Sequence, residues 1–215
     1  MPQLCPICNK RKAERYCPAK GEKICAVCCG TEREVSIDCP SDCSYLIVAR
    51  RYERENRKSY AAGQLPYRSV DASRDYIEEH FEIFGAVMLD VKKFAEENRQ
   101  FYDADAITTL QSLAETFRTL DSGIYYERPP DAPLAHRLYQ QLTAKVGRLR
   151  SDLSGPEEFR KAKTSDWFRV MVFALRAALM ETNGRPRSRA FLDFLRVLLS
   201  PEAGKKTEDP RIIIP

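Results

Sequence analysis

Eight cysteines are the residues of this chain best suited to chemistry, and all of them lie between Cys5 and Cys43. They comprise two C-x2-C pairs, Cys5/Cys8 and Cys25/Cys28, and four further cysteines, Cys17, Cys29, Cys39 and Cys43. In a reducing compartment such clusters favour metal binding over disulfides. Because Zn²⁺ prefers four tetrahedral ligands, eight thiolates predict two closed zinc sites and two Zn²⁺ ions per chain.

The adjacent pair Cys28-Cys29 indicates how the eight thiols divide. Neighbouring side chains on extended backbone point in opposite directions. Cys28 would therefore complete the turn begun by Cys25, while Cys29 would face a second ion. The predicted ligands are Cys5, Cys8, Cys25 and Cys28 for site one, and Cys17, Cys29, Cys39 and Cys43 for site two.

Other uses of the thiols stay open. Four thiolates also suit an iron–sulfur cluster, although the C-x2-C-x2-C-x3-C-P run is not present. A redox centre and plain disulfides are further alternatives. A catalytic zinc is disfavoured, because catalytic sites keep one coordination position for water and an all-thiolate site has none.

Residues 5–43 resemble cross-braced zinc fingers of the HIT, MYND and B-box kind, which alternate ligand pairs in this way. The stretch YCPAK at 16–20 is similar to the tyrosine and C-P-x-C turn of HIT fingers. Lys20 stands at the last ligand position, where we expect Cys29 to substitute, and Cys39 occupies the place of a late histidine. The resemblance implies a treble-clef-like module that binds other proteins. In its order of cysteines followed by helices, the chain resembles uncharacterised bacterial zinc-finger proteins.

The elements that hold these residues change character near residue 44, where short cysteine- and proline-containing segments give way to helical patterns. The predicted fold is mainly α, with a two-zinc module followed by an all-α domain of about five to seven helices. The predicted parts are the module at 1–43, a connecting basic helix at 44–60, a linker at 61–70, the helical domain at 71–203 and an extended tail at 204–215.

Apolar residues in the helical domain recur every three to four positions, which is typical of amphipathic helices. Predicted helices span 71–101, 103–120, 132–153, a stretch from about 157 to 182 with a break near Thr164, and 189–199. An S-x-x-E capping box at 154–157 and Ser188 are expected to begin the last two. Trp167, with its apolar neighbours, is expected to anchor the core.

Two groups of basic residues could contact a phosphate backbone or a protein partner. They are Arg50, Arg51, Arg54, Arg57 and Lys58 after the cysteines, and Arg185, Arg187 and Arg189 before the last helix. Arg50, Arg54 and Lys58 share a helix face at i, i+4 spacing. Solvated helix faces are the alternative explanation, since aromatic residues do not interleave with these groups as stacking platforms would.

The composition, 43% hydrophobic and 31% charged over 215 residues, is that of a globular protein. The formal charge of +4 would be offset by eight thiolates holding two Zn²⁺. The sequence shows neither a signal peptide nor an apolar run long enough for a membrane span, so we expect a cytoplasmic protein without a membrane partner. His80 and His136 lie within helical patterns, and no motif nominates a nucleophile or base.

These patterns predict a non-catalytic zinc-binding adaptor or regulator that acts through protein–protein interaction. It would display the loop at 30–38 and the basic helix that follows. A regulator that binds DNA or RNA is the alternative, and an enzyme with an unrecognised site in the helical domain is the third reading.

Overall fold

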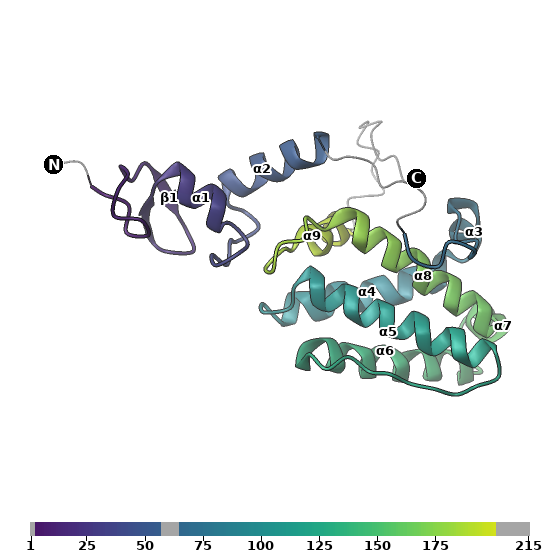
Figure 1. Ribbon diagram of the computed structural model, residues 1–215. Helices are drawn as coiled ribbons and strands as arrows, with labels where there is room; N and C mark the ends of the chain where they lie inside the picture. Colours follow the sequence, from purple (N-terminus) through teal and green to yellow (C-terminus); the bar gives the residue numbers. More distant parts are fainter. Residues whose placement is uncertain (1–2, 57–64, 201–215) are drawn as a thin grey trace. The chain divides into compact units, whose positions relative to one another are not determined.

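The computed structural model describes residues 3–56 and 65–200, and the chain forms two compact units (Figure 1). The first, called the cysteine module below, contains Met1–Ser59 together with Thr182–Ala190. The second, called the helical unit, contains Tyr60–Glu181 and Phe191–Pro215. The prediction of a mainly helical protein with an N-terminal cysteine cluster is confirmed. Arg57, Lys58 and the tail at 204–215 lie outside the described residues.

The cysteine module begins with a two-stranded antiparallel hairpin and continues into two helices. Its elements are β1 (Arg15–Cys17), β2 (Glu22–Ile24), α1 (Ala26–Glu32) and α2 (Ser44–Glu55). Gly21 closes the hairpin at φ +69°, a left-handed conformation that glycine adopts without strain. Several cysteines lie at the ends of these elements. Strand β1 ends at Cys17, Cys25 is the N-cap of α1, and Cys43 is the N-cap of α2.

The helical unit contains seven helices within the described residues, at the upper end of the predicted range. They are α3 (Arg74–Glu79), α4 (Phe81–Glu97), α5 (Asp103–Asp121), α6 (Pro133–Ser151), α7 (Glu157–Lys161), α8 (Thr164–Glu181) and α9 (Ala190–Leu198). Helix α5 packs against α8 and α6, and α4 contacts the same two helices (Figure 1). No helix in the described ranges is both long enough and apolar enough to cross a membrane.

The core of the helical unit is built from the apolar stripes of these helices. Trp167 of α8 is fully buried and lies between Phe117 of α5 and Phe159 of α7, at centroid distances of 6.2 and 6.4 Å. Val170 and Met171 are buried one turn further along, as helical spacing requires. Trp167 therefore anchors this core, as its place in the apolar run predicts.

The predicted helix at 71–101 is wrong in one respect, because two helices occupy it. The chain changes direction at His80, which ends α3 and precedes α4 with φ −115° and ψ 30°. Nδ1 of His80 lies 2.9 Å from the carbonyl oxygen of Tyr76, and the two rings stack at 4.2 Å. A side chain that bonds to the backbone competes with helix continuation, and apolar periodicity does not report this.

Of the two predicted helix caps, one is wrong and the other is confirmed. Ser154 does not cap a helix; its hydroxyl donates to Asp152 Oδ1, and α7 follows Pro156. Ser188 Oγ does accept from the N–H of Ala190 at α9, as predicted. Two further N–H groups of α9, on Phe191 and Leu192, donate to the buried carboxylate of Asp103, each at 3.2 Å. A cap supplied from 88 positions away carries no local sequence signal.

Candidate metal centre

Four thiols of the cysteine module form a compact cluster. The sulfur atoms of Cys5, Cys8, Cys25 and Cys28 all lie within 4.8 Å of one another. Cys8 Sγ and Cys25 Sγ are 4.0 Å apart. Four thiolates about 2.3 Å from a common Zn²⁺ ion would have sulfur–sulfur distances of this order. The residues fit a metal ion, and the predicted cysteine cluster of site one is confirmed at this level.

Local backbone structure brings the two C-x2-C pairs together. The N–H of Cys5 donates to the carbonyl of Arg11, and the turn closes through Asn9, whose φ is +51°. On the other side, Cys25 precedes α1 and its sulfur accepts from the N–H of Cys28 at 3.3 Å. A turn and a helix start therefore each present two sulfurs to one point.

Nearby N–H groups and burial act on these thiols in opposite directions. The N–H groups of Lys10 and Arg11 lower the pKa of Cys8 to about 6, whereas burial raises the pKa of Cys28 to about 12. Burial also acts to raise the pKa of Cys5, but N–H donors from Cys25, Cys8 and Ile7 outweigh it and the pKa of Cys5 is lowered. A divalent cation would remove the repulsion between neighbouring thiolates, so the cluster is suited to binding a cation.

The remaining four thiols lie around a different point of the module. Cys17, Cys29, Cys39 and Cys43 all line one small cavity of about 10 Å³, together with apolar side chains such as Ile37 and Leu46. Burial raises the pKa of Cys39. Within residues 3–56 and 65–200, the first cluster is the only group of three or more His, Cys, Asp or Glu residues whose ligand atoms lie close enough together to hold a metal ion. The sulfur atoms of Cys17, Cys29, Cys39 and Cys43 do not form such a cluster, so a second zinc site is not shown.

The vicinal cysteines divide between these two places, though not for the predicted reason. Cys28 and Cys29 both belong to α1 rather than to extended backbone. Successive residues on an α-helix point about 100° apart, and this is enough to turn Cys28 to the first cluster and Cys29 to the cavity. Arg33, one turn further on, donates to Cys29 Sγ at 3.9 Å.

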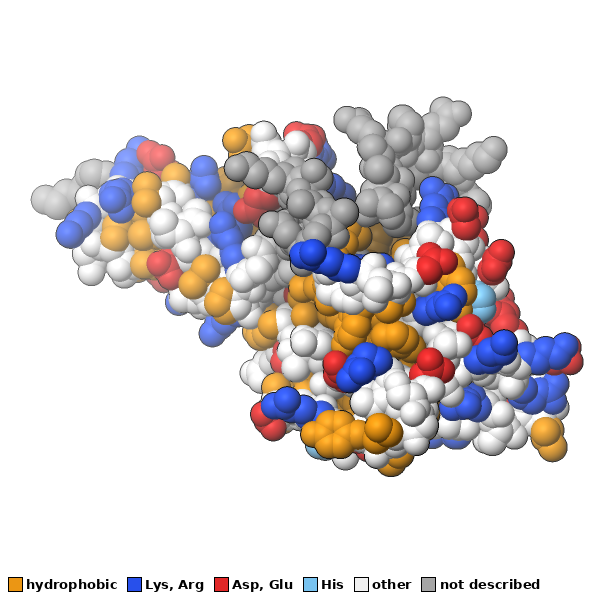
Figure 2. All heavy atoms as spheres, turned by 45° about the vertical axis from the view of Figure 1, so that its right-hand side comes forward, with side chains coloured by type: hydrophobic (Ala, Val, Ile, Leu, Met, Phe, Trp, Pro, Cys, Tyr) orange, Lys and Arg blue, Asp and Glu red, His pale blue; other side chains and the backbone are white. Residues whose placement is uncertain are grey.

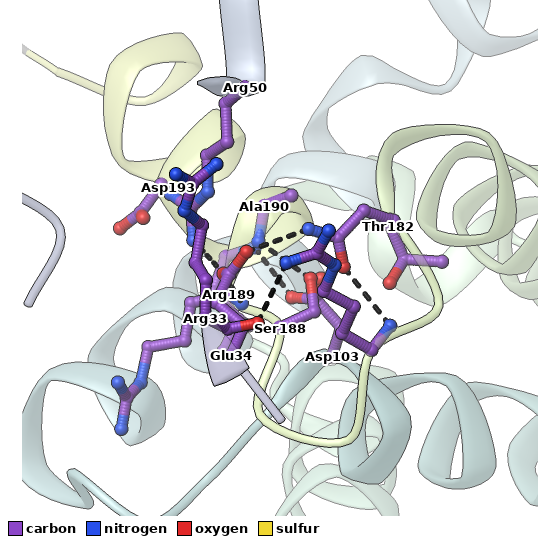
Figure 3. Close-up of polar contacts among 12 residues, drawn as sticks. Arg33, Glu34, Arg50, Asp103, Thr182, Ser188, Arg189, Ala190 and Asp193 are labelled. Atoms are coloured by element: carbon purple, nitrogen blue, oxygen red, sulfur yellow. Dashed lines mark hydrogen bonds and ion pairs between the residues drawn. The ribbon is translucent and has the colours of Figure 1, made fainter. Parts of the chain in front are cut away.

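A buried carboxylate, Glu34, stands beside the thiol sites and was not found from the sequence. It is 1% exposed and has φ +54°, in the left-handed region. Arg50 from α2 donates to its Oε1, and Asn183 Nδ2 donates to its Oε2 at 2.7 Å. Figure 3 shows Arg50 reaching from α2 toward Glu34, with Arg189 beside it. A carboxylate buried this deeply requires such donors.

Most of the basic residues that were predicted as contacts, and that the structure describes, donate to acceptors within the cysteine module itself. Arg185 Nη1 donates to the carbonyl of Arg33 at 2.8 Å, and Arg187 Nη1 donates to that of Ser36 at 3.0 Å. Arg189 Nη1 pairs with Asp38 at 2.8 Å. The loop at 30–38 is therefore not freely displayed, because the segment 182–190 contacts it.

Helix α2 presents its other side to solvent. Val48 and Tyr52 are 65% and 66% exposed, and Ile47, Arg51 and Arg54 are exposed as well. This surface, called the α2 face below, combines apolar, aromatic and basic side chains. The sequence predicted the basic residues as contacts but not their apolar neighbours, although Val48 and Tyr52 share a helix face at i, i+4 spacing.

Charged groups elsewhere pair with one another. In the helical unit, a cavity of about 620 Å³ is lined partly by Lys145, Arg148 and Asp90. Lys145 Nζ lies 2.7 Å from Asp90 Oδ1 and 3.0 Å from the carbonyl of Ala86. In the view of Figure 2, Lys and Arg side chains are mixed with Asp and Glu around an area of apolar side chains.

The chain was compared with protein-family models, curated proteins and solved structures. No protein-family model, no curated protein and no solved structure matches the chain.

Proposed function

We propose that this chain is a non-catalytic zinc-binding adaptor or regulator, whose cysteine module folds on two Zn²⁺ ions and binds another protein. The observation that carries the proposal is the cluster of Cys5, Cys8, Cys25 and Cys28 within 4.8 Å. Four thiolates complete a tetrahedral shell and leave no position for water or substrate. Such an ion stabilises a fold and presents a surface, rather than catalysing a reaction.

The second ion would be held by Cys17, Cys29, Cys39 and Cys43. Their shared position around one small cavity supports this assignment. Cys43 directly precedes α2, and Cys29 and Cys39 flank the loop at 30–38. A second ion would therefore fix both the start of α2 and the conformation of that loop.

The α2 face is the proposed contact for a protein partner. Aromatic residues and arginine are enriched at the centres of protein interfaces, and Tyr52 with Arg51 and Val48 supplies this combination. Helix α2 begins at the thiol sites, so the metal-bound module would hold the face rigid. Val48, Arg51 and Tyr52 stand at i, i+3 and i+4, the spacing by which a groove or another helix recognises one face of a helix.

The alternative of nucleic-acid binding has less support. Arg50, Arg185 and Arg189 are each engaged with a carboxylate of the module, namely Glu34, Glu53 and Asp38. An arginine so paired contributes less to phosphate binding. Arg51 and Arg54 remain exposed on α2, alongside apolar groups that a phosphate backbone would not need.

Metal analysis of the full chain tests the first step. We expect about two Zn²⁺ per wild-type chain. Cys29→Ser should lose one ion, while the ion at Cys5 and Cys8 survives with weaker affinity. Loss of both ions, loss of neither, or iron in the purified protein would contradict the ligand assignment.

Substitutions on the α2 face separate the two classes of partner. With Val48→Glu or Tyr52→Ala, a protein partner recovered from the native host should be lost while the zinc content stays unchanged. A nucleic-acid binder would instead lose affinity with Arg51→Ala or Arg54→Ala, and its affinity would fall steeply with salt. The second pattern would replace the adaptor proposal with the alternative.

A further inference from the structure

Arg33 is a buried cation beside the second set of thiols. It lines the small cavity that Cys17, Cys29, Cys39 and Cys43 share, and the residue is only 9% exposed. Burial of a guanidinium group is costly unless negative charge or strong acceptors lie within its reach. The surroundings of Arg33 therefore bear on the charge of the thiols next to it.

Sulfur is the side-chain acceptor that the structure gives to this guanidinium group. Nη2 of Arg33 lies 3.9 Å from Cys29 Sγ, and within the described residues no carboxylate forms an ion pair with Arg33. The carboxylate of the next residue, Glu34, is bound by Arg50 and Asn183. Four protonated thiols offer no negative charge, whereas four thiolates around one Zn²⁺ ion carry a net charge of about −2. A buried arginine is therefore better matched to the metal-bound form of these cysteines.

Local structure holds Arg33 in this place. It is the C-cap of α1 and stands four residues after Cys29, a spacing at which helical side chains are neighbours. Its carbonyl oxygen accepts from Arg185 Nη1 at 2.8 Å, and its backbone forms a single β-bridge with that of Ile37. The backbone is thus fixed on both sides, and only the rotamer of the side chain decides whether the guanidinium group reaches the sulfur.

An arginine lies beside the first thiol cluster as well. A hydrogen bond to Cys25, together with the charge of Cys8, raises the pKa of Arg11, whose carbonyl oxygen accepts from the N–H of Cys5. Arg11 is exposed, so water and salt screen its charge, whereas Arg33 is buried. We therefore expect the larger effect on a bound metal ion from Arg33.

We propose that Arg33 is a positioning residue for the metal ion held by Cys17, Cys29, Cys39 and Cys43. It donates to the sulfur of Cys29 and compensates part of the negative charge that four thiolates leave around a Zn²⁺ ion. The inference rests on the second ion of the proposed function and adds to that ion a residue outside its ligand set. Residues that hydrogen-bond to metal ligands change metal affinity by about tenfold to a hundredfold when they are substituted.

Cobalt substitution on the full chain tests this role, because Co²⁺ bound to thiolates absorbs light through sulfur-to-metal charge transfer. Arg33→Met removes both the N–H donors and the charge, which raises the energy of the sulfur electrons. The charge-transfer band should move to longer wavelength, and competition with a chelator should show about tenfold lower affinity for the second ion. In the Cys29→Ser background, which lacks the second ion, Arg33→Met should leave the spectrum unchanged.

Two further variants separate this role from others. Arg51→Met removes an exposed arginine of α2 and changes the net charge equally, but should move neither the band nor the affinity. Arg33→Lys keeps the charge and loses the planar donors, so it should retain both ions with a smaller shift of the band in the same direction. It replaces Arg33→Met if that variant does not fold.

The outcomes distinguish this inference from the proposed function. Two ions per wild-type chain with an unmoved band in Arg33→Met would overturn the inference alone. Lower affinity without a shift would also overturn it, because a side chain that only stabilises the end of α1 would give that result. An equal shift with Arg51→Met, or loss of both ions from Arg33→Lys, would contradict it as well. One ion per wild-type chain would overturn both the second site and the role of Arg33.

Discussion

The two units of this chain bury different kinds of group. The cysteine module encloses few large aliphatic side chains, namely Ile24, Ile37 and Leu46, and it also buries thiols and polar groups such as the carboxylate of Glu34. The helical unit encloses one continuous apolar core that includes Trp167 and Phe101, both fully buried. Small units without a sufficient apolar core need cross-links or metal to fold. This difference supports the proposal that the module folds on metal, whereas the helical unit has an apolar core of its own.

Each unit also uses one buried carboxylate to hold a segment distant in sequence. Glu34 accepts from Asn183 and Arg189 in the module, and Asp103 accepts from the N–H groups of Phe191 and Leu192 in the helical unit. The chain passes from one unit to the other at Ala190. Residues on either side of this boundary are thus held by charge-assisted hydrogen bonds, which are stronger than neutral ones.

The largest expected effect comes from breaking the first thiol cluster. Cys25→Ser removes one ligand of the cluster, and its side chain also accepts from Cys28 N–H at the start of α1. Because binding free energies of structural zinc are on the order of 10 kcal/mol, the module should lose its metal and its fold. Zinc analysis and limited proteolysis measure this. The thermal transition of the helical unit should stay where it is; an equal fall in its Tm would refute the independence of the two units.

A substitution in the apolar core should destabilise the helical unit and leave the cysteine module unaffected. Trp167→Ala leaves a cavity between Phe117 and Phe159 and should lower the free energy of unfolding of the helical unit by about 3–5 kcal/mol. Urea denaturation followed by far-UV circular dichroism measures the loss, and Trp167→Phe should cost less. Zinc content should remain at the wild-type value. If the metal were lost as well, the core would not belong to the helical unit alone.

Removal of a cap should have a smaller effect. Asp103→Ala leaves the N–H groups of Phe191 and Leu192 without their acceptor, at a cost of about 1–2 kcal/mol in unfolding free energy. Asp103→Asn keeps one acceptor oxygen and is the matched control. The same denaturation experiment measures both variants. Equal stability of wild type and Asp103→Ala would show that this carboxylate does not hold α9.

The smallest effect is expected at the junction of α3 and α8. Tyr76 donates from its hydroxyl to Asp166 Oδ1 at 2.6 Å, so Tyr76→Phe should cost about 1 kcal/mol. Burial acts to raise the pKa of Asp166, but the Tyr76 hydroxyl and the Lys163 N–H outweigh it, and the pKa is lowered overall. A lowered folded pKa gives stability that is present above the unfolded pKa and is lost as pH falls through the folded one.

The difference between Tyr76→Phe and wild type should therefore shrink in acid, below the usual pKa of aspartate. Denaturation at neutral pH and at a pH below that range provides the comparison. A difference that stays constant across this range would mean that the charge of Asp166 does not strengthen the bond.

Sequence patterns predicted the features that depend on local spacing. The C-x2-C pairs gave the first thiol cluster, and apolar periodicity gave α5, α6 and the buried Trp167. Features built from distant residues were missed, because a single chain without its contacts does not show them. Glu34 resembles any loop glutamate in sequence, and only the fold reveals that Arg50 and Asn183 converge on it. The break at His80 is likewise accompanied by a bond between its ring and the carbonyl of Tyr76, which apolar periodicity does not show.

Hydrogen–deuterium exchange on the full chain, before and after metal removal with a chelator, tests the central claim most directly. We expect amides of residues 3–56 and 182–190 to lose protection together, because they belong to one compact unit that we propose to fold on metal. Protection in α5 and α8 should persist, and the fluorescence of Trp167, the one tryptophan of the sequence, should not change. Protection of 3–56 that survives chelation, or loss of protection in α5 and α8 at the same time, would contradict it.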